Sequence, residues 1–514
     1  MAGAVSHSPL VPQPDTSRRP EQNKNSNNID IEHLAFGTEE AVYEYQYDKE
    51  PISFPVRILT EILKRCNGSK TTLKILNLEH LRIVGTNQQE FQDAFDQLSR
   101  CSSMCEFVFR SCTFQVDNEL RAANAATATA TDNGRIFNRM FQALNEINAL
   151  EVIVINNDDG VISLDGDDFP DIFTSTTCSS HNHQIQKQKQ TQKQKRRKQL
   201  KVLSLSSCAL SDHFLEKMFG EKSRVEKLCL VDTITSTHQL RKIADLLRTQ
   251  NQSIKYLNIR SSEEECITAI PETLELLKAL ECNNTLKYIH LEVNCDLERR
   301  GDGANVLNSD TAHSFIDAIQ KLGGLQILAL DFSHLGTAVK SKNDITLQHI
   351  SSILRNGLSK NQCLKKFSFV LASFHRMAHE DQEKFKKSMT AEINKSLIHA
   401  LSSAPSSSKN EKKRMSCHPS SVLEDYRFYI DGNFLVKPNP TTKFWLSMNQ
   451  KDMRQTLHRH PDDFKLWRDA IIEHNKNNNN NSNKGKGDKN SNNGPDIIYH
   501  LLRQNHALLI HPTR

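Results

Sequence analysis

Residues 200–210 read Leu200-Lys-Val-Leu203-Ser-Leu205-Ser-Ser-Cys208-Ala-Leu210. Their apolar residues follow the spacing L-x-x-L-x-L-x-x-[NC]-x-L, typical of a short strand that buries alternate residues and then turns. The spacing returns through the chain, so a strand is predicted about nine times. The other segments with the three leading apolar positions are Leu73/Leu76/Leu78, Met104/Phe107/Phe109, Leu150/Ile153/Ile155, Val225/Leu228/Leu230, Ile254/Leu257/Ile259, Leu286/Ile289/Leu291, Leu325/Leu328/Leu330 and Leu364/Phe367/Phe369.

Helical periodicity separates these strands. In Gln239–Leu247, apolar residues recur at three- and four-residue steps, as Leu240, Ile243, Leu246 and Leu247. Asn or Gly then precedes the next strand, as at Asn283 and Gly323-Gly324, which favours a helix end there. Similar periodicity predicts helices at Glu90–Leu98, Pro271–Leu280, Thr311–Leu322 and Thr346–Leu358.

The strand-turn-helix unit resembles the ribonuclease-inhibitor type of leucine-rich repeat, from about Leu73 to Phe374. This resemblance implies an α/β solenoid shaped as a horseshoe, with a parallel sheet on the concave face, helices outside, and protein binding as its main use. Immune receptors with such repeats also carry a nucleotide-binding loop of the form G-x-x-x-x-G-K-[ST], which is missing from this sequence.

The layout also resembles uncharacterised algal leucine-rich-repeat proteins, which end in a helical cap. The resemblance rests on Phe54-Pro55-Val56 and Ile62–Cys66 near the start. Near the end it rests on Phe444–Asn449, Trp467 and Ile498–Arg503, although Gln450 and Lys451 replace the usual glycine and arginine. It implies the same architecture and no particular function.

Composition divides the chain into segments. Low-complexity and charged stretches cannot bury enough apolar surface to offset the entropy of ordering. The predicted organisation is a disordered, acidic region at 1–50, a capping helix at 51–72, the solenoid at 73–400 with insertions near 121–132 and 157–199, a linker at 401–421, and a helical cap at 422–514 interrupted by an Asn-rich loop at 475–493.

Overall charge and apolar content limit the function classes. The net charge of +5 is mild for 514 residues, so nucleic acid is not a favoured partner. We find no secretory signal and no run of about 20 apolar residues, which predicts an intracellular protein, cytoplasmic or nuclear, with no membrane contact. The 12 cysteines contain no C-x-x-C pair and are interpreted as small buried residues, Cys112 and Cys208 at the [NC] position of the repeat.

Strand alternation predicts which side chains a protein partner would touch. The third, fifth and seventh positions of each repeat should point out of the concave sheet. Aromatic and charged residues at these positions are typical of binding hot spots, although a merely solvated face is an equal alternative. The candidates are Tyr256, Asn258 and Arg260, Tyr288, His290 and Glu292, and Asn77, Glu79 and Arg110.

Two other functions stay open. Residues 54–66 distantly resemble the start of an F-box, which would make the chain a substrate adaptor of a ubiquitin ligase; a GTPase regulator is a related possibility, and a plain capping helix is the alternative. The run Lys195, Arg196, Arg197 and Lys198 could be a nuclear-localisation patch of an RNA-associated factor. A solvated insertion is the favoured interpretation of that tract.

No catalytic signature is found. Motifs of hydrolases, metalloproteases, kinases and phosphate-binding loops are missing from the sequence, and Cys178, His181 and His183 have no fourth metal ligand nearby. We therefore expect a protein that is not an enzyme, with no catalytic residues, cofactor, metal or small-molecule substrate.

Overall fold

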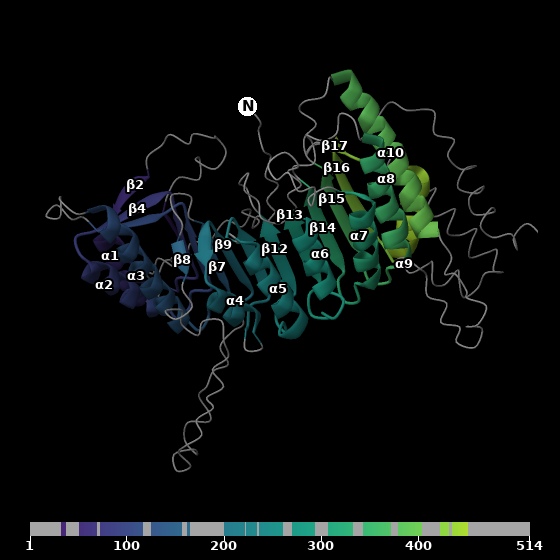
Figure 1. The fold of residues 1–514 in the computed structure, drawn as a ribbon. Helices are drawn as coiled ribbons and strands as arrows, with labels where there is room; N and C mark the ends of the chain where they lie inside the picture. Colours follow the sequence, from purple (N-terminus) through teal and green to yellow (C-terminus); the bar gives the residue numbers. More distant parts are fainter. Residues whose placement is uncertain are drawn as a thin grey trace, which may run out of the picture. The chain divides into compact units, whose positions relative to one another are not determined.

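The computed structural model describes residues 32–36, 51–68, 72–116, 125–156, 162–164, 200–220, 223–233, 236–260, 270–292, 307–332, 343–371, 379–402, 422–430 and 434–450. The chain divides into two compact units, Met1–Glu265 and Cys266–Arg514. Each is an α/β unit with a mainly parallel sheet and a layer of helices beside it (Figure 1).

The main sheet of the first unit contains seven described strands, all parallel to their neighbours. Its order is β1 (His33–Phe36), β3 (Ile75–Glu79), β5 (Glu106–Arg110), β7 (Val152–Asn156), β9 (Val202–Ser206), β11 (Lys227–Val231) and β12 (Tyr256–Arg260). The repeat frames pair in register, for example Phe107 with Ile153 and Leu203 with Leu228. Every leading apolar position of the frames is buried, which confirms that they face the core.

A left-handed residue ends four of these strands. His80, Ser111, Ser207 and Asp232 have φ near +50°, and each donates its N–H to the carbonyl that ends the neighbouring strand, as Ser207 does to Val231 at 2.9 Å. After three of these turns the chain forms a second short strand. These strands are β4 (Leu81–Gly85) and β6 (Thr113–Val116), which join β2 (Ile52–Pro55), and β10 (Cys208–Leu210), which joins β8 (Ile162–Leu164).

Two cysteines occupy the predicted [NC] position behind these turns. Cys112 Sγ donates to the carbonyl of Arg110 at 3.1 Å, and Cys208 Sγ donates to that of Ser206 at 3.3 Å. Both side chains are fully buried. Burial raises the pKa of Cys208 to about 12, so this thiol is a structural hydrogen-bond donor.

The helices of the first unit are amphipathic and bury one face. They are α1 (Val56–Gly68), α2 (Gln88–Ser99), α3 (Ala125–Glu146), α4 (Asp212–Phe219) and α5 (Thr237–Thr249). Neighbours pack together, α1 on α2, α2 on α3 and α4 on α5. Side chains of Asn87, Ser211 and Ser236 cap α2, α4 and α5 by accepting a backbone N–H three residues on, which starts each helix at a defined residue.

The second unit repeats the plan. Its parallel strands are β13 (Tyr288–Glu292), β14 (Ile327–Phe332), β15 (Lys366–Leu371) and β16 (Asp425–Ile430), and β17 (Phe434–Leu435) pairs antiparallel with β16. Its helical segments are α6 (Ile270–Ala279), α7 (Ser309–Lys321), α8 (Asn343–Ser352), the π-helical turn η5 (Ile353–Gly357), α9 (Leu358–Lys360), α10 (His379–Ser402) and α11 (Pro440–Gln450). Within the described ranges, no helix combines the length and apolar composition needed to span a bilayer.

Buried asparagines connect helices to the following strands. Asn251, Asn283 and Asn361 each lie three residues before the first apolar position of a repeat, and each Oδ1 accepts the N–H of that residue. The asparagine turns predicted as helix ends are therefore also the start signals of the strands.

Four segments differ from the organisation expected from composition. Residues 33–36 of the predicted disordered start form β1. A strand at the edge of a sheet needs little apolar surface, and the backbone N–H groups of Lys74 and Ile75 donate to the carbonyl of Glu32 just before this strand. The insertion near 121–132 contributes to α3, and the insertion 157–199 contains β8. The predicted helical cap begins instead with β16 and β17, since Leu423, Tyr426 and Phe428 repeat the buried frame, and only then reaches α11.

Candidate functional site

We use the name strand face for the third, fifth and seventh positions of each repeat in the main sheets. These side chains lie on the opposite side of each strand from the buried frame. In β7, β9, β12 and β13 the pattern is strictly alternating, with the strand-face residues half-buried and the residues between them buried. The strand face is thus the part of the sheet that another molecule can reach.

The structure brings together three of the predicted residues on this face. Arg110 on β5 pairs with Glu79 on β3 at 3.1 Å, and Asn77 Nδ2 donates to the same Glu79 oxygen at 3.2 Å. Only 8% of Glu79 is exposed, whereas Arg110 remains exposed. The trio joins two strands and neutralises the carboxylate, so it presents a guanidinium held in one place.

The remaining predicted residues lie on two strands of different units. Tyr256, Asn258 and Arg260 are on β12 of the first unit, in register with Lys227, Cys229 and Val231. Burial raises the pKa of the Cys229 thiol, and a hydrogen bond from Asn258 opposes that rise.

Tyr288, His290 and Glu292 are on β13 of the second unit, in register with Ile327, Ala329 and Asp331. All three are half-buried. Lys195, Arg196, Arg197 and Lys198, together with the cluster at Cys178, His181 and His183, lie outside the described residues.

Sequence reasoning overlooked the centre of the strand face in the first unit. There Val152, Val154 and Val202 are half-buried, and Glu106 and Lys227 lie at the two sides. The signal was present, because these residues occupy the same frame positions as the predicted ones. Valines in strands are common for packing reasons alone, which hid their position on the outer side.

Several strand-face amides lack a full set of hydrogen bonds. The Oδ1 atoms of Asn77, Asn156 and Asn258 have no hydrogen-bond partner among the described residues. An amide oxygen in this state is an unused acceptor, and rotation of the side chain would let it meet an N–H from a bound molecule.

Charges at the second repeat position form ion pairs along the edge where the strands begin. Lys74 pairs with Glu32 at 2.6 Å, and Lys201 pairs with Glu151 at 2.6 Å. Further along, Lys255 pairs with Glu226 at 3.4 Å, and in the second unit Lys365 pairs with Glu424 at 2.8 Å. Such half-exposed pairs contribute little stability each, but these eight charged side chains already have a partner of opposite charge.

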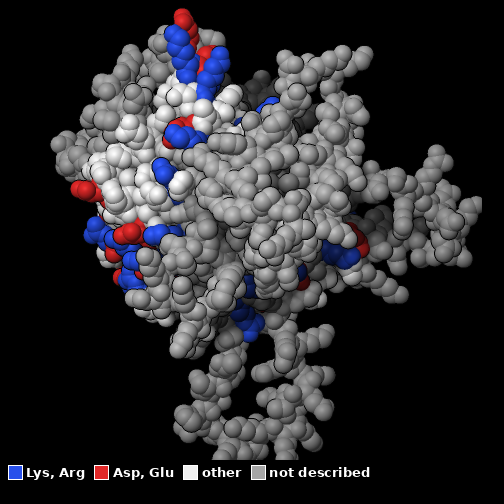
Figure 2. Space-filling model, turned by 90° about the vertical axis from the view of Figure 1, so that its right-hand side faces the viewer, with Lys and Arg blue, Asp and Glu red and all other residues white. Residues whose placement is uncertain are grey.

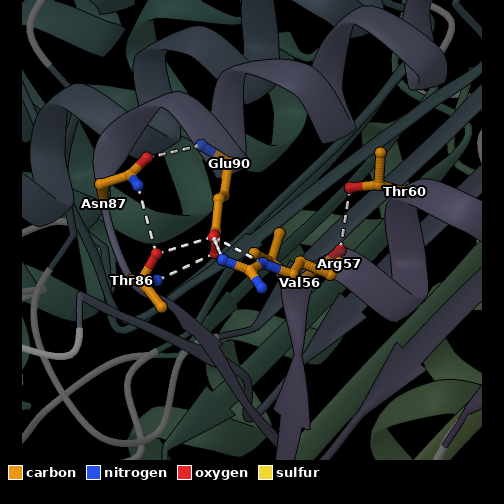
Figure 3. Close-up of polar contacts among 6 residues, drawn as sticks. All are labelled: Val56, Arg57, Thr60, Thr86, Asn87 and Glu90. Atoms are coloured by element: carbon orange, nitrogen blue, oxygen red, sulfur yellow. Dashed lines mark hydrogen bonds and ion pairs between the residues drawn. The ribbon is translucent and has the colours of Figure 1, made fainter.

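A polar cluster holds the first helices together at the beginning of the first unit (Figure 3). Glu90 of α2 accepts from Thr86 N at 2.9 Å, from Thr86 Oγ1 at 2.7 Å and from Arg57 Nε of α1 at 2.6 Å. Burial acts to raise the pKa of Glu90, but the hydrogen bonds from Thr86 and Arg57 prevail and lower it. The cluster is a helix cap that also joins α1 to α2.

Neither metal ligands among the described residues nor charges on the face drawn in Figure 2 mark another site. In the view of Figure 2, described acidic and basic side chains are interspersed and form no patch of one sign. No group of three or more His, Cys, Asp or Glu residues there could hold a metal ion. The strand face is therefore the candidate site that the described residues offer.

Comparison with known proteins does not assign a family or a function to this chain. No model of a known protein family matches the chain, and no curated protein matches it.

Proposed function

We propose that this chain is a noncatalytic binding protein that recognises another protein through the strand face. The observation that carries the proposal is the alternation in β7, β9, β12 and β13, which leaves one row of side chains half-exposed behind every buried row. Side chains on a rigid sheet lose little freedom on binding, which favours recognition.

We also propose that the two units together form a leucine-rich-repeat solenoid. The repeated frame, the parallel strands and the neighbouring helix layer support a leucine-rich-repeat horseshoe of the ribonuclease-inhibitor type, with the strand face on its concave side. Small-angle scattering of the full chain tests it, because a horseshoe and a compact globule of 514 residues differ in radius of gyration.

We place this activity inside the cell, in the cytoplasm or nucleus. All cysteines among the described residues are free thiols, including the buried Cys66, Cys101, Cys112 and Cys208. Free thiols in such number are typical of a reducing compartment. Fluorescence microscopy of the tagged full chain tests this location.

The test of binding is affinity purification with quantitative mass spectrometry. The full chain is compared with Tyr256→Ala/Arg260→Ala/Tyr288→Ala/His290→Ala, after circular dichroism has shown that both are folded. Arg248→Ala/Lys242→Ala, on α5 of the helix layer, is the matched control. We expect a protein that is retained by the wild type and the control and lost from the strand-face variant. Partners that survive the strand-face substitutions and are lost with the control would contradict the proposal.

A further inference from the structure

Four side chains of the first unit form one row across β5, β7, β9 and β11. The strand register pairs Glu106 with Val152, Val152 with Val202, and Val202 with Lys227. Glu106 and the two valines are half-buried, and Lys227 is exposed. Because neighbouring strands lie about 4.8 Å apart, the two charges stand about 14 Å apart with an apolar stretch between them.

The charges at the ends of this row, Glu106 and Lys227, form no ion pair with any residue that the structure describes. In contrast, the charged residues just before β7, β9, β11 and β12 do, as in Lys201–Glu151 and Lys255–Glu226. Within the described part of the chain, the row therefore leaves one carboxylate and one ammonium available to another molecule.

The middle of the row favours an apolar occupant. Val154 lies on the same face as Val152, two residues further along β7, and is also half-buried. Covering these side chains removes apolar surface from water. The occupant should thus carry an apolar stripe with one charge at each end.

The backbone chemistry of the sheet decides the shape of that occupant. Strands β5, β7, β9 and β11 are each paired on both sides, so an incoming strand finds no free edge in the row. An extended segment lying over the valines would leave its own N–H and C=O groups unpaired against apolar surface. A helix satisfies these groups internally, so it can cover apolar side chains without that penalty.

We infer that the row Glu106–Val152–Val202–Lys227 binds an amphipathic helix that crosses the strands, with a cationic side chain at Glu106 and an anionic side chain at Lys227. The inference rests on the proposed function and specifies the partner. Since a helix rises 1.5 Å per residue, the two charges of the partner lie about nine residues apart, on either side of an apolar stripe.

The experiment uses a displayed library of helical peptides selected against the full chain. Each peptide has Leu and Ala in its middle and, about nine residues apart, two end positions randomised among acidic, basic and neutral residues. The wild type should enrich peptides with opposite charges at the two ends about fivefold over peptides with like charges, since an exposed ion pair changes affinity by roughly that factor.

Single charge reversals give the row two like charges, so the charges of the enriched peptides no longer depend on the direction in which the helix lies. Lys227→Glu leaves two acidic ends and should enrich peptides with two basic ends, and Glu106→Lys should enrich peptides with two acidic ends. The matched control reverses an ion pair on the helix layer, Glu216→Lys/Lys242→Glu, and should keep the wild-type preference. Val202→Asp should abolish enrichment; all variants are first compared with the wild type by thermal unfolding.

The outcomes separate this inference from the proposed function. Peptides whose charge preference ignores both reversals, or that survive Val202→Asp, overturn the row as a helix site, and so does a selection that enriches nothing. If protein partners are still lost from the tyrosine, arginine and histidine variant described above, recognition by the strand face stands and only the helix assignment falls.

Discussion

The side-chain amide of Asn361 donates to the main-chain oxygen of Ile319 at 2.6 Å, which joins the turn before β15 to the end of α7. The same side chain accepts the N–H groups of Leu364 at 2.7 Å and Cys363 at 2.9 Å. Only 1% of Asn361 is exposed. One buried amide therefore both closes a turn within a repeat and connects it to the preceding repeat.

Asn361→Ala is expected to lower the free energy of unfolding by about 2–4 kcal/mol, because it leaves several buried backbone groups without partners. Urea denaturation followed by circular dichroism measures the change. Asn356→Ala is the control, since Asn356 is exposed and, among the described residues, its side-chain amide bonds only to Ser352 Oγ at 3.0 Å. Equal stabilities of the two variants would contradict the role given to Asn361.

Two adjacent glycines should respond differently to the same substitution. A Cβ atom on Gly324 would lie 2.7 Å from the carbonyl oxygen of Asn283 and from the Cα of Asn284, whereas on Gly323 its nearest neighbour would be 3.8 Å away. Gly324→Ala is expected to destabilise the protein by about 1–3 kcal/mol through this clash. Gly323→Ala should stay within about 0.5 kcal/mol of the wild type. Thermal unfolding of both variants checks the difference, and a similar loss in both would refute it.

The left-handed backbone at Ser207 predicts which substitutions lower stability there, and burial of the side chain alone would not predict the same ranking. Ser207 has φ of 54°. Ser207→Val should cost about 1–2 kcal/mol, because a β-branched side chain clashes with the backbone in this region, while Ser207→Gly should be neutral or stabilising. Ser206→Val, one residue earlier in the extended strand β9, is the control and should be tolerated. Unfolding midpoints in urea give the ranking, and an intact midpoint for Ser207→Val would count against it.

The cap at Glu90 predicts a pH dependence. The pKa of Glu90 is lower in the folded protein than its usual value, so its contribution is fully present above the unfolded-state pKa and is lost as pH falls through the folded-state pKa. At neutral pH, Glu90→Gln should lower stability by about 1 kcal/mol, as loss of a cap does. The difference between variant and wild type should shrink as the pH falls through the lowered pKa of Glu90, because the wild-type carboxyl then becomes protonated.

Unfolding in urea across this pH range measures the difference at each pH. Glu61→Gln is the control, because the one ion pair of Glu61 within the described ranges is an exposed pair with Arg65 on α1. A gap between Glu90→Gln and the wild type that stays constant down to acid pH would show that the charge of Glu90 is not what the cap uses.

The strands could be predicted from sequence where their side chains are both apolar and periodic. Leu203 and Leu205 are recognisable because large apolar residues two positions apart recur in every repeat, and all of them are buried. β16 was missed because Tyr426 takes a leucine position, and β1 because backbone pairing, which leaves little trace in the residue types, defines it. The helix α3 was hidden by an Ala/Thr run that composition alone suggests is unstructured.

For the candidate site, the sequence predicts which side of the sheet the residues occupy, but not the contacts between them. Alternation correctly places Asn77, Glu79 and Arg110 on one side of the sheet, but it does not reveal that Arg110 and Asn77 both bond to Glu79. It also does not reveal which charges are left over. Whether Glu106 or Lys227 has a partner depends on side chains of other strands, which periodicity within a single strand does not contain.

The in-register row that ends in Glu106 and Lys227 has a consequence for how such a protein changes over evolutionary time. Each repeat adds one residue to the row, and that residue is not part of the buried frame. Gain or loss of a whole repeat between β5 and β11 would therefore move the two charges apart or together by one strand spacing, about 4.8 Å, while leaving the packing of each repeat intact. Duplication of a repeat would thus change the charge spacing that a bound partner has to match in steps of one strand, without changing the packing of the core.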